Sequence, residues 1–383
     1  AMSIRKLLAR STSSVSTRGL RHVAKRPAAN MPGTIALKLD PQIIAESMGK
    51  ITEGSIVVVG TNGKTTITNM IADALERQGK TVACNRTGAN LAYGVATTLL
   101  QSKGAQWGVF ESDELWLAHT LPQVQASYVL LLNLFRDQLD RCGEIDRVQD
   151  AIVQALTESP DTVLLYNADD PLCAMVALRV PNEAIAFGVG EDLHQQQNVV
   201  SDAQMCQRCS AMFTYEYRQY GQLGTYSCPN CGFKRPELDF AAKHAVFGND
   251  ITFDVEERAT GSSVSLHAQR AGVYMIYNVM AAWLASHCAG VSDEVFQQAV
   301  DLFDTQHRRL QSLTIQGRPV LLNLAKNPTG FNQNMKLITQ AEGKKVAAFF
   351  INDNEADGHD ISWIWDCDFE ELAEQEDVIV YAG

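Results

Sequence analysis

Apolar runs in the first half of the chain alternate with stretches of helical spacing. Residues 65–80 carry apolar positions at intervals of three and four, as one face of a helix requires. Strands of a parallel sheet have nearly continuous apolar sequences, because crossover helices bury both faces. The runs with this character are residues 55–60, 107–112, 126–134 and 162–169. The pattern predicts an α/β fold in which a parallel sheet carries helices on both faces.

This alternation breaks between residues 199 and 236, where short aromatic and polar segments surround four cysteines. Such a break is typical of an inserted module. Residues 273–290 then restore a long apolar helix, and a last α/β unit begins near residue 318 and ends directly after an apolar strand run. We therefore expect a smaller and shortened C-terminal α/β domain.

The expected organisation has a basic N-terminal segment at 1–49, a central domain at 50–298 with an insertion at 203–237, and a C-terminal domain at 299–383. With 383 residues the chain is too long for one ordinary core, and its 46% of apolar residues is ample for globular folding. No apolar run reaches the roughly 18 residues that a membrane-spanning helix needs.

The charge is distributed unevenly. A formal net charge of −12 argues against a protein that binds nucleic acid through its overall field. The first 26 residues nevertheless carry seven Lys or Arg and no acid. That composition occurs in mitochondrial transit peptides, but we favour a basic helix that lies on the protein or on an anionic membrane.

The heptapeptide GTNGKTT at residues 60–66 lies between a predicted strand and a predicted helix, as a phosphate-binding loop requires. Glycines let backbone N–H groups turn inward, Lys64 can reach the outer phosphates and Thr65 can bind Mg²⁺. Val58 stands where the general Walker loop has its first glycine. The residues expected to contact a nucleotide here are Gly60, Thr61, Asn62, Gly63, Lys64, Thr65 and Thr66.

Four cysteines in the insertion form two C-x₂-C pairs separated by 18 residues. This spacing is typical of a zinc ribbon, in which two knuckles close a tetrahedral structural site. The predicted zinc ligands are Cys206, Cys209, Cys228 and Cys231. A nucleic-acid-binding ribbon is the alternative, but Lys234 and Arg235 alone supply too little positive charge for it. The other five cysteines lack the context of a catalytic thiol, and we interpret them as small apolar residues.

The short form GTNGKT and four further motifs resemble the Mur ligase family: FESDE, NLFRDQLDR, NADDP and YNVMAA. The resemblance implies ATP and Mg²⁺ as cofactors, with Glu111 as a magnesium carboxylate and Lys64 as a catalytic group. It also implies nucleotide contacts at Asn167 and Asn278. Two departures put a second Mg²⁺ site in doubt: Gln138 replaces a metal-binding histidine, and residues 104–233 contain no lysine for carbamylation.

The ribbon, together with NRTGANL, LAKNPTGFNQ and NDNEADGHDISWIWDCDFE, narrows the resemblance to Mur ligases that form a two-subunit lipid II isoglutaminyl synthase. It implies that ATP activates the α-carboxylate of D-glutamate in the lipid II stem peptide. Ammonia from a separate GatD-like glutaminase subunit then gives D-isoglutamine. The resemblance implies a cytoplasmic protein, peripheral at the inner face of the plasma membrane, whose C-terminal domain faces the partner. It suggests no role for Lys326.

The acidic stretch 352–363 follows a predicted strand and contains no nucleophile. A cysteine glutaminase needs a histidine whose tautomer is fixed by a third group, and another chain can supply that group. The resemblance implies this role for Asp360, and we take Asp357 in the same stretch as the second candidate. The alternative is a solvated turn whose aspartates cap the next helix.

Two other functions stay open at this point. One is an autonomous amino-acid ligase of Mur or folylpolyglutamate type, against which the ribbon and the short C-terminal unit argue. The other is a zinc-ribbon binding protein with a degenerate nucleotide site, against which Lys64, Thr65 and Glu111 argue. An ATPase that requires lipid II, glutamine and a second polypeptide distinguishes the synthase from both.

Overall fold

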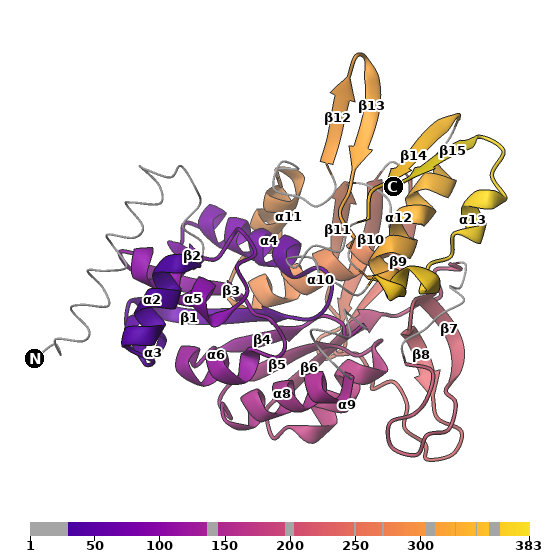
Figure 1. Ribbon diagram of the computed structural model, residues 1–383. Helices are drawn as coiled ribbons and strands as arrows, with labels where there is room; N and C mark the ends of the chain where they lie inside the picture. The colour runs from indigo at the N-terminus through magenta and orange to yellow at the C-terminus, as the bar shows by residue number, and fades with distance from the viewer. Residues whose placement is uncertain are drawn as a thin grey trace, which may run out of the picture.

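The computed structural model describes residues 30–135, 145–195, 203–248, 250–269, 272–303, 311–325, 327–341, 343–351 and 361–383 (Figure 1). Several positions singled out above lie outside the described residues. These are the basic stretch 1–26, Gln138, Lys326, Asp357 and Asp360.

A mixed sheet of nine strands forms the centre of the described chain, in the order β11-β10-β9-β6-β5-β4-β1-β3-β2. Neighbouring strands pair parallel along the row β2, β3, β1, β4, β5, β6 and β9. Strand β10 pairs antiparallel with both β9 and β11. Their bounds are β1 Ile51–Val59, β2 Val82–Cys84, β3 Ala105–Glu111, β4 Tyr128–Leu131, β5 Val163–Asn167, β6 Ala184–Val189, β9 Phe240–Phe247, β10 Asp250–Glu257 and β11 Ser263–Gln269. The four predicted strands are confirmed as β1, β3, β4 and β5.

Helices cover both faces of this sheet (Figure 1), which confirms the predicted α/β class. One layer holds α4 (Lys64–Arg77), α10 (Val273–Cys288) and α11 (Asp293–Asp301). The other holds α2 (Met31–Leu39), α3 (Ile43–Met48), α5 (Ala92–Gln101), α6 (Leu117–Val124), α8 (Ile145–Thr157) and α9 (Pro171–Arg179). The apolar residues of α4 recur at helical intervals and are buried, so the helix predicted from the spacing in residues 65–80 is confirmed. In the described part of the chain, no helix is both long and apolar enough to cross a bilayer.

Helices α2 and α3 fall within the N-terminal segment that the sequence analysis separated from the central domain. Ala36, Ile43 and Ile44 are nevertheless fully buried, in the same core as α5 and the sheet. Residues 31–48 therefore pack as part of the central body. The division at residue 49 stays a prediction.

The insertion contains the antiparallel hairpin of β7 (Thr214–Tyr220) and β8 (Leu223–Ser227). The C-terminal region has an antiparallel hairpin, β12 (Gln311–Ile315) and β13 (Arg318–Leu322), and a parallel pair, β14 (Lys345–Phe349) and β15 (Val378–Ala382). Between these strands lie α12 (Pro328–Gln340), the 3-10 helix η2 (Ser362–Asp366) and α13 (Glu370–Ala373). A separate small core of Phe331, Met335, Cys367 and Leu372 supports the α/β unit that the sequence predicted.

Strand β1 lies between β3 and β4. The chain leaving β1 continues to β2 on one side of β1, and the chain leaving β3 continues to β4 on the other side. In open α/β sheets, ligands bind beyond the carboxyl ends of the strands at such a switch point. The loops after β1, β3 and β4 meet there, and they carry the predicted nucleotide residues.

Candidate functional site

The loop after β1 has the backbone of a phosphate cradle. Gly60 and Gly63 adopt φ values of 137° and 93°, which side chains rarely tolerate. A Cβ at Gly60 would also approach the backbone of Asn133 to 2.9 Å. Helix α4 begins immediately after Gly63 and has no side-chain cap on its first N–H groups. Uncapped N–H groups at a helix N-terminus favour an anion, and a phosphate suits this position.

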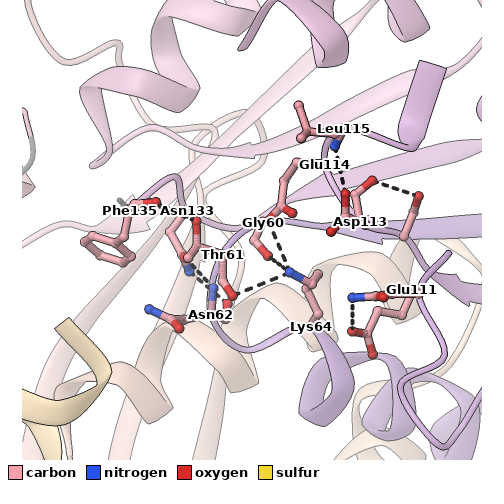
Figure 2. Close-up of polar contacts among 12 residues, drawn as sticks. Gly60, Thr61, Asn62, Lys64, Glu111, Asp113, Glu114, Leu115, Asn133 and Phe135 are labelled. Atoms are coloured by element: carbon pink, nitrogen blue, oxygen red, sulfur yellow. Dashed lines mark hydrogen bonds and ion pairs between the residues drawn. The ribbon is translucent and has the colours of Figure 1, made fainter. Parts of the chain in front are cut away.

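Asn133, in the loop that follows β4, fixes the position of this phosphate loop. Its backbone oxygen accepts from the Thr61 amide at 2.9 Å, and its side-chain oxygen accepts from the Asn62 amide at 2.9 Å. The Asn133 side-chain nitrogen donates to the Asn62 carbonyl at 3.0 Å (Figure 2). Asn133 is the first residue of the NLFRDQLDR motif, but the sequence alone gave it no role, because its partners lie about 70 positions earlier in the chain.

Lys64 is buried at the start of α4, and its ammonium group faces the loop. Nζ donates to the Gly60 carbonyl at 2.5 Å and lies 3.1 Å from Oε1 of Glu114 (Figure 2). Burial lowers the pKa of an ammonium group, but the carboxylates of Glu114, Glu111 and Asp113 outweigh it here. The pKa of Lys64 is therefore raised, and a positive charge is held where the outer phosphates of a nucleotide would lie. Glu114 is the last residue of the FESDE motif, but its ion pair with Lys64 was not predicted from the sequence.

Glu111 ends β3, and its side chain meets the first turn of α4. Oε2 accepts from the Thr65 hydroxyl at 2.7 Å, and Oε1 accepts from the Asn90 amide at 3.4 Å. Asn85 exchanges two hydrogen bonds with the Glu111 backbone, at 2.8 and 2.9 Å, and so fixes the end of the strand. A hydroxyl next to a carboxylate fits Mg²⁺, which prefers oxygen ligands and retains several waters. Thr65 and Glu111, the predicted magnesium ligands, thus lie side by side. Asn85 and Asn90 of the NRTGANL motif hold Glu111 in place.

The two asparagines predicted to contact the nucleotide occupy different settings. Asn278, on α10, lies against the phosphate loop, since its Oδ1 would be 2.8 Å from a Cβ on Gly63. Asn167 is buried at the end of β5, where its amide donates to the Leu132 carbonyl at 3.0 Å and accepts from Asp169 N–H at 3.1 Å. Asn167 therefore joins the ends of β4 and β5 in this structure. Nucleotide binding by either side chain stays a prediction.

The four cysteines of the insertion converge. Their sulfur atoms all lie within 4.8 Å of one another, with Cys206 and Cys231 at 3.6 Å and Cys209 and Cys228 at 3.4 Å. A Zn–S bond of about 2.3 Å in tetrahedral geometry separates sulfurs by about 3.8 Å, which this cluster approaches. The cluster predicted from the spacing is confirmed, and its donor set fits a zinc ion.

Each cysteine pair is followed by a residue in left-handed conformation, Ser210 at φ 58° and Gly232 at φ 74°. Hydrogen bonds from the Asn230 side chain and the Ala211 amide lower the pKa of the Cys209 thiol to about 6, whereas burial raises the pKa of the Cys206 thiol to about 12. Such bonds stabilise a thiolate, the form that binds a metal.

Comparison with known proteins identifies the family. Residues 324–383 match the family described as MurT ligase C-terminal, and residues 58–231 match the Mur ligase middle domain. The MurT subunit of the glutamine-hydrolysing lipid II isoglutaminyl synthase of Staphylococcus aureus (strain COL) is 31% identical over 368 residues, which is 95% of this chain and 82% of that protein. This chain belongs to the MurT family. The corresponding subunit of Streptococcus pneumoniae (strain ATCC BAA-255 / R6) is 33% identical over 359 residues, 92% of this chain and 78% of that protein.

Membership in the MurT family makes the chain a ligase subunit and confirms the resemblance drawn from its motifs. Solved structures agree on the Mur ligase fold. MurF from Acinetobacter baumannii superposes with a TM-score of 0.65 at 17% identity, covering 91% of this chain and 71% of that one. A pseudomurein peptide ligase type C from Methanothermus fervidus gives 0.65 at 17% identity, covering 87% and 68%. At these identities the likeness shows the fold alone.

Proposed function

We propose that this MurT-family chain amidates lipid II. In this reaction the α-carboxylate of D-glutamate in the stem peptide is converted to a carboxamide, which gives D-isoglutamine, and ATP is consumed. The ammonia comes from glutamine, hydrolysed by a separate GatD-like subunit. The observation that carries the proposal is the convergence of Lys64, Thr65 and Glu111 at the phosphate loop of a chain from this family.

The reaction consists of two displacements. A carboxylate oxygen attacks the γ-phosphorus of ATP, ADP leaves, and an acyl phosphate forms. The ammonia nitrogen then attacks the acyl carbon, inorganic phosphate leaves with the electron pair of its C–O bond, and nitrogen loses a proton. Both steps need positioning and charge stabilisation more than covalent help from the protein.

The residues of the loop supply that stabilisation. Lys64 places a fixed positive charge at the outer phosphates, and the first N–H groups of α4 face the same anion. Thr65 and Glu111 would hold Mg²⁺, which when bound neutralises phosphate charge. Glu114 accepts from Lys64 in this structure, so an incoming phosphate would compete with that carboxylate for the ammonium group.

The assay that tests the proposal reconstitutes the chain with a GatD-like glutaminase. We expect ATP hydrolysis to require lipid II, glutamine and the second polypeptide together, with isoglutaminyl lipid II as product by mass spectrometry. Free ammonium should replace both glutamine and the partner, because it is the nucleophile. Turnover with a free amino acid in place of ammonia would instead identify an autonomous ligase. Tight binding of DNA or RNA without ATP turnover would identify a nucleic-acid-binding ribbon.

We propose that the cysteine cluster holds one structural zinc ion, because four thiol ligands leave no open position. Cys228→Ser should lower the zinc content to near zero and destabilise the protein by about 2 to 4 kcal/mol, measured as a fall in melting temperature of roughly 5 to 10 °C. Cys288→Ser is the matched control, since Cys288 is half-buried at the end of α10 and distant in sequence from the cluster. A zinc-free wild-type protein with unchanged melting would contradict the proposal.

We propose that the basic N-terminus attaches the enzyme to the inner face of the membrane, where a lipid-anchored substrate would lie. Each Lys or Arg near an anionic surface contributes on the order of 1 kcal/mol, so several together give weak, salt-sensitive attachment. Deleting residues 2–26 should reduce sedimentation with phosphatidylserine or phosphatidylglycerol vesicles at low salt and leave binding to neutral vesicles unchanged. Equal binding by both forms would give the segment another role.

A further inference from the structure

The hairpin β7–β8 connects the cysteine cluster with the nucleotide loop. One end lies beside the cluster, where Thr214 pairs with Ser227 immediately before Cys228. The other end is the turn from Tyr220 to Leu223, whose Gln222 and Leu223 are fully buried. Hairpin turns normally lie on the surface, because their backbone groups need water. This turn is inserted into the central domain.

The buried turn contacts the loop that follows β4. Nε2 of Gln222 donates to the Leu134 carbonyl at 2.9 Å and lies 3.4 Å from both carboxylate oxygens of Asp170. Asp170 in turn accepts from the Leu134 amide at 2.8 Å. The Phe135 ring lies so close to Gly221 that a Cβ there would approach it to 2.8 Å. Leu134 and Phe135 are thus fixed by the hairpin and by Asp170.

The same two residues support the phosphate loop. The Phe135 amide donates to the Thr61 hydroxyl at 2.9 Å, and this hydroxyl lies 3.1 Å from the Phe135 carbonyl (Figure 2). Thr61 is the residue between Gly60 and Asn62 in the loop. A displacement of Gln222 would therefore reach the phosphate loop through a single intervening segment.

A second connection runs from the insertion to Asn278. Arg235 lies four residues after Cys231, and its Nη1 is 2.9 Å from Oδ1 of the fully buried Asp169. The other carboxylate oxygen of Asp169 accepts from the Tyr277 hydroxyl at 2.6 Å. Tyr277 precedes Asn278, which lies against Gly63.

We infer that the hairpin β7–β8 is a positioning element of the nucleotide site. Metal binding at the cysteine cluster then sets the affinity for Mg·ATP through Gln222 and Asp169. Gln222 and Tyr277 are positioning residues, because they act through Leu134 and Asn278. The inference rests on the proposed function in taking the loop at residues 60–66 as the ATP site.

The test measures Mg·ATP binding by calorimetry, with zinc content and melting temperature, on the full chain in complex with its glutaminase partner. Gln222→Met keeps the volume and removes the donor, and we expect ATP affinity to fall about five- to tenfold, the cost of a buried hydrogen bond, with zinc retained. Gln219→Met is the matched control. Gln219 is equally buried on β7, but its side chain donates to the Glu191 carbonyl and accepts from the Leu193 amide instead of bonding the segment after β4. Its variant should bind Mg·ATP within about twofold of wild type.

Stepwise removal of zinc with a chelator should weaken Mg·ATP binding in proportion to the metal lost. Wild-type affinity in zinc-loaded Gln222→Met would overturn the inference. If that variant does not fold, Tyr277→Phe replaces it, since this change keeps the ring and removes only the hydroxyl; unchanged affinity would again overturn the inference. Lys64→Ala tests the proposed ATP site separately from the role of the hairpin. If wild type and Lys64→Ala bind ATP alike, the assignment of the loop at residues 60–66 as the ATP site fails.

Discussion

Replacing Lys64 by alanine should abolish ATP-dependent amidation, with a loss of at least about 100-fold in kcat, the usual effect of removing one preorganised electrostatic group. The ammonium group is buried and its pKa is raised by surrounding carboxylates, so it carries its charge throughout the physiological pH range. In the variant no side chain at position 64 can reach the outer phosphates. The measurement is amidated lipid II formed with saturating ammonium, which bypasses the glutaminase.

Removing Lys64 also leaves the Glu114 carboxylate buried without its partner, which destabilises the fold. The double variant Lys64→Ala, Glu114→Gln removes that unpaired charge, so we expect its melting temperature to recover while its activity stays lost. Lys80→Ala is the matched control, because Lys80 forms a half-exposed pair with Glu53 at 2.8 Å. An active Lys64→Ala enzyme would refute the nucleotide assignment.

Replacing Asp360 by asparagine should abolish glutamine hydrolysis by the complex, with a loss of about 100-fold or more, while ammonium-dependent amidation continues. We propose that Asp360 completes the glutaminase triad in the partner, a role implied by the family resemblance. A carboxylate holds the histidine in the tautomer that can accept the thiol proton and stabilises the resulting positive charge. Asparagine is similar in size but carries no charge.

Two assays on one preparation separate this role from a structural one. Glutamine hydrolysis and ammonium-driven ATP turnover are measured on the Asp360→Asn complex after gel filtration confirms assembly. Asp353→Asn is the control within the same acidic stretch, and it should retain glutaminase activity. Asp357→Asn tests the second choice. Wild-type glutamine turnover by Asp360→Asn would show that this acid serves another purpose.

Much of the fold follows from local sequence patterns. Continuous apolar runs identified β1, β3, β4 and β5, because a strand buried on both faces leaves no polar position. The alternating exposure of β10 and its antiparallel pairing with β9 and β11 were not predicted. The choice between parallel and antiparallel pairing at a sheet edge depends on which strand lies next to it, and spacing along the chain does not specify that neighbour.

The residues of the candidate site also fall into two groups, those that sequence patterns identify and those that only the tertiary structure brings together. The sequence by itself determined the phosphate loop and the cysteine cluster, because the loop residues are adjacent and the cysteines form two C-x₂-C pairs, so that the required backbone is local. Only the tertiary structure placed Glu114 beside Lys64, 50 positions away, and Gln222 beside Leu134, 88 positions away. In the sequence Gln222 is an ordinary polar residue near a glycine, typical of an exposed turn. Its burial depends on how the inserted hairpin packs against the loop after β4, and packing between distant segments is set by the shapes of both surfaces together.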